Sequence, residues 1–106
     1  MEHIVLLKFK PQVTADTIAA FGQEILHLQE VVPGIIDMAW GENKNTQHGK
    51  EYTHALVARM ENFDVLQAYE VHPDHVAVVK QFPSLVADFL IIDFTSPRVA
   101  PLRSRV

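Results

Sequence analysis

The stretch AYEVHPDHVAVV, residues 68–79, brings together side chains that are suited to moving protons. Tyr69, His72 and His75 lie within seven positions, and Pro73 separates the two histidines. Histidine takes or gives a proton near neutral pH, and a phenol donates a hydrogen bond to an oxygen atom that becomes negative. The segment therefore suits proton-transfer chemistry, provided that the fold directs these side chains into one cavity.

The same residues also have simpler structural interpretations. A proline disfavours helical backbone in the residue before it and suits the first turn of a helix, so HPD at residues 72–74 is typical of a helix start. Tyr69 could be a packing residue with a hydrated hydroxyl group. His72 and His75 could share a metal ion, but two histidines without a carboxylate or cysteine motif do not form a typical site, and we expect no metal.

The hydropathy pattern predicts the elements that must position these groups. Short runs rich in β-branched and aromatic residues predict strands, and apolar residues at helical spacing predict helices. The strands are expected at residues 3–9, 35–41, 51–60 and 88–95, and the helices at 14–30, from Asn62 or Asp64 through Tyr69, and at 74–82, interrupted before Pro83. This order predicts an α+β, ferredoxin-like fold of the split βαβ type, an antiparallel sheet with helices on one face.

Both faces of the predicted sheet are apolar. In the first strand Val5 and Leu7 point to one side, and Ile4 and Leu6 point to the other. The helices of so short a chain cover only one face, so we expect a homodimer in which the uncovered faces of two sheets pack together. A monomer whose second face is covered by the C-terminal tail and the long loop is the alternative.

On the face covered by helices we expect a small-molecule pocket. The first and third strands are central neighbours in this topology, so His3 and His54 are expected side by side, facing the helices that carry Tyr69 and His75. Apolar residues are expected to form the walls, namely Val5, Leu7, Phe21, Leu56 and Val78. Taken singly, each strand histidine is more often a core residue whose ring is satisfied by hydrogen bonds.

Composition narrows the classes of function. The chain has 106 residues, no cysteine and a formal charge of −4, although residues 96–106 carry three arginines and no acid. An acidic body does not suit nucleic acid, and without cysteine or a glycine-rich phosphate loop we expect no cofactor.

No apolar run approaches the ~20 residues of a membrane span, so we expect a cytoplasmic protein without membrane partners. We expect one domain over residues 1–96 and a basic tail, residues 97–106, that frays or straps across a partner.

Several segments together resemble the stress-responsive A/B barrel (Dabb) family. They are HIVLLKF, the WG after the second strand, YTHALV, YEVHPDH and LIIDF, over about residues 2–96. The most specific feature is HPxH after a short helix, combined with a final apolar strand that ends in Asp-Phe. The resemblance implies a ferredoxin-like protomer and a homodimer whose two sheets form a barrel.

Within that family the chain is similar to the plant polyketide cyclases. This similarity implies an aldol condensation of a polyketide-like substrate without metal or cofactor. It implies His75 as the base that removes a proton from an activated methylene group, and Tyr69 as the group that holds the carbonyl oxygen. It also implies that His3 and His54 border the pocket. An aromatic pocket residue of those cyclases is Val78 here, which implies a cavity of different shape.

Three interpretations of the function stay open. The first is a dimeric stress-response protein with a pocket for a small hydrophobic ligand. The second is a cofactor-free polyketide cyclase, aldol-type lyase or isomerase that uses Tyr69 and His75. The third is a structural protein whose stable assembly is the function. A mass well above that of a dimer would favour the third, and a Tyr69 hydroxyl and His75 ring that point apart would exclude the second.

Overall fold

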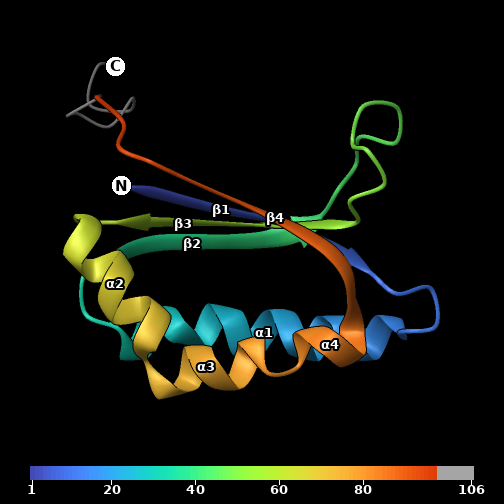
Figure 1. Cartoon of the computed structure of the whole chain (residues 1–106), viewed down its shortest axis with the longest axis horizontal. Helices are drawn as coiled ribbons and strands as arrows, with labels where there is room; N and C mark the ends of the chain where they lie inside the picture. Colours follow the sequence, from blue (N-terminus) through green and yellow to red (C-terminus); the bar gives the residue numbers. More distant parts are fainter. Residues whose placement is uncertain (98–106) are drawn as a thin grey trace.

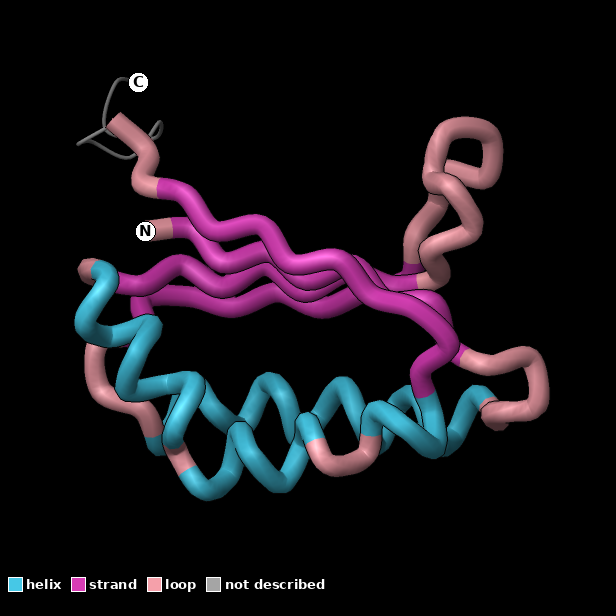
Figure 2. Tube along the Cα trace, viewed as in Figure 1, coloured by secondary structure: helices cyan, strands magenta, loops and turns pink. Residues whose placement is uncertain are grey.

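The computed structural model, which describes residues 1–97, has an antiparallel sheet as one layer and helices as the other (Figures 1 and 2). The elements are β1 (Glu2–Phe9), α1 (Ala15–Val31), β2 (Ile35–Glu42), β3 (His54–Met60), α2 (Phe63–Val71), α3 (Pro73–Val79), α4 (Phe82–Leu85) and β4 (Val86–Phe94). The strand order is β2-β3-β1-β4, with all helices on one face. The predicted α+β, ferredoxin-like fold class is confirmed.

Two predicted boundaries differ from the structure by three residues, and the others agree within two. The third strand begins at His54 rather than at residue 51, because Lys50 and Glu51 have left-handed backbone with φ of 51° and 67° and belong to the preceding loop. That loop projects from the sheet on the side away from the helices (Figure 1). The helix expected at 74–82 ends at Val79, and Pro83 lies in the first turn of the separate helix α4.

Side-chain caps fix where the helices begin. The Thr14 side chain accepts a hydrogen bond from a backbone N–H of the first turn of α1, and Asn62 does the same for α2. His72 lies between α2 and α3 with extended backbone, and its Nδ1 accepts a bond from the Asp74 N–H at 3.1 Å. The HPD segment therefore starts a helix as predicted, and its cap sets the turn between the helix of Tyr69 and that of His75.

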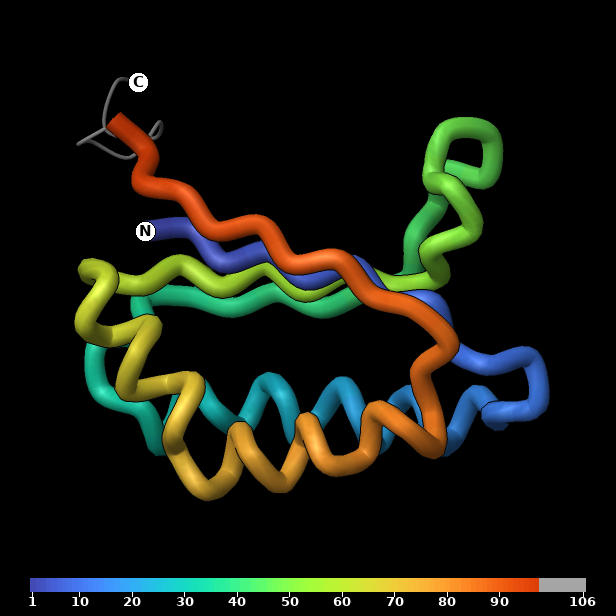
Figure 3. The backbone as a smooth tube through the Cα atoms, in the orientation of Figure 1, coloured from blue at the N-terminus to red at the C-terminus, as the bar shows by residue number. Residues whose placement is uncertain are grey.

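The central strand β1 is paired along its length with β3 on one side and β4 on the other. Figure 3 shows β1 and β4 running next to each other, although they come from opposite ends of the described chain. Large side chains fill the space between the two layers and are almost completely buried; the largest are Tyr69, Phe21, Leu7, Leu28, Met60 and Leu66. This core packs β1, which carries His3, against the helix layer.

The face of the sheet away from the helices is apolar and uncovered in the single chain. Its exposed side chains include Ile36, Val57, Leu90, Ile92 and Phe94, each between 42% and 55% exposed. A register shift in β2 between residues 35 and 37 turns Ile36 to this face, although its spacing from Met38 predicts the opposite side.

Within residues 1–97 no helix has the length and apolar character needed to cross a membrane. Nearly all of the predicted basic tail lies outside the described residues.

Candidate active site

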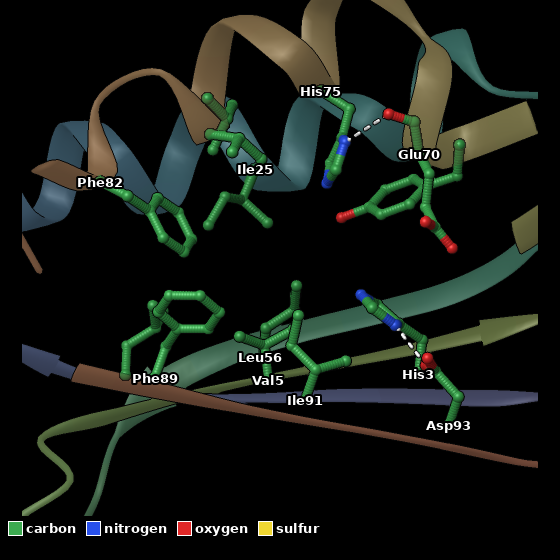
Figure 4. A pocket seen from close by; sticks show the side chains of 14 residues that line it. His3, Val5, Ile25, Leu56, Glu70, His75, Phe82, Phe89, Ile91 and Asp93 are labelled. Carbon is green, nitrogen blue, oxygen red and sulfur yellow. Dashed lines mark hydrogen bonds and ion pairs between the residues drawn. The ribbon is translucent and has the colours of Figure 1, made fainter. Parts of the chain in front are cut away.

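A pocket of about 330 Å³ lies between the sheet and the helix layer. Its polar and apolar groups are separated: Figure 4 shows His3, Asp93, Glu70 and His75 at one end and the rings of Phe82 and Phe89 at the other. Of the predicted wall residues, Val5, Leu7, Leu56 and Val78 border this pocket. A molecule with one polar and one hydrocarbon end would match both halves.

His75, in the first turn of α3, has a defined tautomer and faces the pocket. Its Nδ1 lies 3.0 Å from the backbone oxygen of Glu70, and a carbonyl oxygen only accepts hydrogen bonds, so Nδ1 carries the hydrogen. In the neutral ring the lone pair is therefore on Nε2, and Figure 4 shows the ring directed into the pocket. Burial lowers the pKa of His75, opposed in part by the bond to Glu70, so the ring is available as a base at neutral pH.

Tyr69, near the end of α2, lies against His75 and keeps its proton. Its side chain is only 1% exposed, and its ring centroid is 4.3 Å from that of His75. Burial raises the pKa of the phenol, and the nearby charge of Glu70 adds to the shift. Tyr69 borders the pocket and makes no hydrogen bond through its hydroxyl group within residues 1–97, so this group is free to donate to a bound molecule.

His3, on β1, is the third polar group that faces the pocket. Its Nδ1 lies 2.5 Å from Oδ1 of Asp93, which the pairing of β1 with β4 places directly opposite. A carboxylate accepts, so Nδ1–H of His3 donates and Nε2 is left on the pocket side, as Figure 4 shows. The ring also packs edge-on against Tyr69, with centroids 5.4 Å apart. The structure therefore brings His3, Tyr69 and His75 together.

His54 does not join this group. The antiparallel register pairs His3 with Ala58 but pairs His54 with Leu7, so the two histidines lie four residues apart along β1, about 14 Å at about 3.4 Å per residue. The expectation that they lie side by side is wrong, because strand order alone does not fix the register. His54 instead stacks on Trp40 at 5.3 Å, and burial lowers its pKa.

Phe21 belongs to the same aromatic cluster as His54 and does not border the pocket. Its ring packs against Phe9 at 5.5 Å and against Phe82 at 6.0 Å, and its side chain is 1% exposed. The cluster lies toward the other end of the sheet from His3. The structure therefore gives Phe21 a core position and leaves Phe82, its neighbour, to form the pocket wall.

Sequence reasoning did not find Asp93, Phe89 or Ile91, which line the pocket from β4. Asp93 is the one acidic residue in the apolar run LIIDF, and that interruption is a usable signal for a functional carboxylate. The alternation of a strand also places residues 89, 91 and 93 on one side. Within residues 1–97, no cluster of three or more histidine, aspartate or glutamate side chains is arranged to hold a metal ion.

Comparison with known proteins places this chain in a family. A family model described as the stress responsive A/B barrel domain matches residues 1–96. The chain is 32% identical over 97 residues to olivetolic acid cyclase of Cannabis sativa, covering 90% of this chain and 95% of the cyclase. It is 28% identical over 107 residues to a stress-response A/B barrel domain-containing protein of Arabidopsis thaliana, covering 99% and 91% of the two chains.

A solved structure agrees in fold. It is described as a dimeric ferredoxin-like protein of unknown function from Thermobifida fusca, with a TM-score of 0.77 and 27% identity over 90% of this chain and 89% of that chain. The family match and the cyclase match together confirm the resemblance drawn from the segments HIVLLKF, YEVHPDH and LIIDF. The chain belongs to the stress-responsive A/B barrel (Dabb) domain family.

Proposed function

We propose that this protein is a cofactor-free enzyme that removes a proton from a carbon atom next to a carbonyl group and uses the resulting enolate in an aldol-type ring closure. The observation that carries the proposal is the position of His75. Its Nδ1 is held by the Glu70 carbonyl, its Nε2 faces an otherwise largely apolar pocket, and its ring lies 4.3 Å from that of Tyr69.

The two residues have complementary roles in this reaction. His75 takes the proton from the activated methylene group through Nε2. The carbonyl oxygen of the substrate becomes negative as the proton leaves, and the neutral phenol of Tyr69 donates a hydrogen bond to it. Because most of the pocket wall is apolar, this hydrogen bond stabilises the enolate more than it would in water.

The pocket and the relatives support the substrate class. The polar end, at His75 and Glu70, suits a chain of ketone groups, and the end at Phe82 and Phe89 suits a hydrocarbon tail. Olivetolic acid cyclase, at 32% identity, is a cyclase by name. We therefore propose a small polyketide-like ligand with an apolar end.

The proposed enzyme is a homodimer. The apolar outer face of the sheet, which includes Val57 on β3 and Ile92 on β4, needs a cover, and a second copy of the same face supplies one. The similar protein from Thermobifida fusca is described as dimeric, which supports this arrangement.

Deuterium exchange tests the base directly. The probe is a linear triketone in which one methylene group lies between two carbonyls and the third carbonyl is within reach for closing a six-membered ring. We expect the protein to exchange that methylene in D₂O faster than buffer does, measured by proton NMR. His75→Gln should lower the protein-dependent rate by about 100-fold or more, which is typical of losing a general base.

The pH dependence gives a second check. His75 acts only when it is neutral, and burial lowers its pKa, so the exchange rate should fall only at pH values below the ordinary range of histidine. If the triketone binds in the pocket of a crystal but the wild-type protein does not accelerate exchange, the site is a ligand-binding site and the proposed catalysis is wrong.

A further inference from the structure

We propose that His3, held by Asp93, is the proton donor of this site and works opposite the base His75. The inference deepens the proposed function and rests on it. It assigns a catalytic role to a histidine of the sheet layer and a positioning role to a carboxylate of the edge strand β4.

The first argument is the geometry around Tyr69. Two imidazole rings approach this phenol from different layers: His3 from β1 at 5.4 Å and His75 from α3 at 4.3 Å between ring centroids. Both rings border the same pocket, and both have Nδ1 occupied by a hydrogen bond, so each presents Nε2 to the pocket (Figure 4). A bound carbonyl compound would lie between two nitrogen atoms that can exchange protons with it.

The second argument is that the two rings have different partners. His75 is held by a backbone carbonyl, which is a neutral dipole, whereas His3 is held by the carboxylate of Asp93 at 2.5 Å. A carboxylate stabilises the imidazolium form through a charge-assisted hydrogen bond, and a neutral carbonyl does so less. The contact with Asp93 therefore suits His3 to the role of proton donor, whereas burial and, to a smaller extent, the nearby His3 lower the pKa of His75. When two groups of the same type have such different hydrogen-bond partners, one is suited to act as the acid and the other as the base.

The groups that face His3 come from three elements. They are Asp93 of β4, Tyr69 and Glu70 of α2, and His75 of α3. Of these, Asp93 is the partner in direct hydrogen-bond contact, and Tyr69 stays neutral because burial raises its pKa. The carboxylate of Asp93 is thus the charged group in closest contact with His3.

The proton balance of a ring closure fits this assignment. His75 Nε2 takes a proton as the methylene C–H bond breaks, and the new carbanion forms a C–C bond with the distant carbonyl carbon. The oxygen of that carbonyl becomes an alkoxide, and His3 Nε2–H gives it a proton to form the hydroxyl group. Substrate and product then have the same atoms. The proton on His75 returns to His3 through solvent before the next turnover.

The test separates the two steps with the probe triketone. Exchange of the methylene in D₂O needs only the base, whereas ring closure also needs the donor. His3→Gln should lower the rate of ring closure at least about 100-fold more than it lowers the rate of exchange. His75→Gln should lower both rates by about 100-fold or more. Equal losses of closure and exchange in His3→Gln would overturn the role of His3 while leaving the proposed function intact.

Asp93→Asn tests the positioning residue without removing its acceptor atom. The amide oxygen still accepts the bond from His3 Nδ1–H, but the negative charge is gone. We expect the pH above which ring closure is lost to move to a lower value, with a loss in rate of at least about tenfold at neutral pH. A pair that merely joined β1 to β4 would leave the pH profile unmoved, and that result would overturn the inference.

The chain supplies a matched control pair. His27 and Glu30 form the same kind of contact, Nδ1 to carboxylate oxygen at 3.0 Å, on the solvent side of α1. His27→Gln and Glu30→Gln should leave both the closure-to-exchange ratio and its pH profile unchanged.

A measurement on the ligand-free protein makes the inference independent of turnover. Imidazole nitrogen NMR at about pH 6.5 should show a larger protonated fraction for His3 than for His75, and Asp93→Asn should reverse or remove that difference. A larger protonated fraction on His75 in the wild-type protein would overturn the assignment, whatever the protein does to the triketone.

Discussion

His54 and His75 are both partly withdrawn from water, but only His75 borders the pocket that Tyr69 and His3 share. Burial lowers the pKa of each, through aromatic packing against Trp40 for His54 and through the cover of α2 and α3 for His75. Their unfolded-state values lie near 6.5, so between that pH and the lower folded-state values the unfolded chain binds more protons than the folded chain. The stability that these residues contribute is therefore present above about pH 6.5 and is lost as the pH falls through the folded-state values.

The lowered pKa values of His54 and His75 predict that the folded protein becomes less stable as the pH falls. The free energy of unfolding, measured with urea, should fall between about pH 7 and about pH 5. His54→Gln should make that decline shallower, because the side chain that must take up a proton on unfolding is gone. His27→Gln, on the solvent side of α1, is the control. A decline just as steep in His54→Gln as in the wild-type protein would contradict this account.

At the scale of elements, α1 approaches β2 closely enough to need a residue without a side chain. A Cβ atom added to Gly22 would lie 2.4 Å from Nε1 of Trp40, well inside contact distance. The Trp40 ring in turn holds Phe21 and His54, so the close approach of helix and strand sets the aromatic cluster at this end of the sheet. Glycine in the middle of a helix costs about 1 kcal/mol relative to alanine, and the contact is what requires it.

We therefore predict that Gly22→Ala destabilises the protein by about 1–3 kcal/mol, because overpacking outweighs the gain in helix propensity. Urea denaturation measures the change. Gly41→Ala is the matched control, since nothing lies within 4 Å of a Cβ atom built there. A Gly22→Ala variant as stable as wild type would show that the indole ring moves aside without cost.

Local sequence patterns predict the order of the elements, whereas strand register decides features that the sequence does not reveal. The strand and helix order and the HPD helix start follow from local patterns, and they suffice to bring His3, Tyr69 and His75 together. The position of His54 depends on register, which pairs it with Leu7 and which hydropathy does not encode. The role of Asp93 depends on the register of β1 against β4 in the same way. The start of β3 depends on two left-handed residues in the loop, and neither is the glycine that would have signalled that conformation.

At the scale of the molecule, the sheet has two apolar faces and the helices cover one. Val57 on the central strand β3 and Ile92 on β4 are 42% and 44% exposed on the uncovered face. Such a row of exposed apolar side chains on a sheet marks an interaction surface. Two copies packed face to face would bury these residues and leave the pocket, on the other side of each sheet, to the helices.

We predict that Val57→Lys converts the dimer into a monomer, because it places a charge in the centre of the packed faces. Sedimentation equilibrium at micromolar concentration should show the mass of one chain for the variant and of two for the wild-type protein. Val71→Lys, at a position on α2 that is 76% exposed, should leave the mass unchanged. A wild-type mass of one chain would exclude the dimer, and a mass well above two chains would favour a larger assembly.

The contact between His3 and Asp93 joins residues that are 90 positions apart. During synthesis, His3 therefore leaves the ribosome long before the carboxylate that holds it. A nascent chain that stops before β4 can already contain every helix and the other three strands that the structure describes for residues 1–97. It lacks the pocket wall that β4 forms and the Asp93 carboxylate that holds His3. Binding of a small ligand would thus distinguish a chain that includes β4 from one that stops before it.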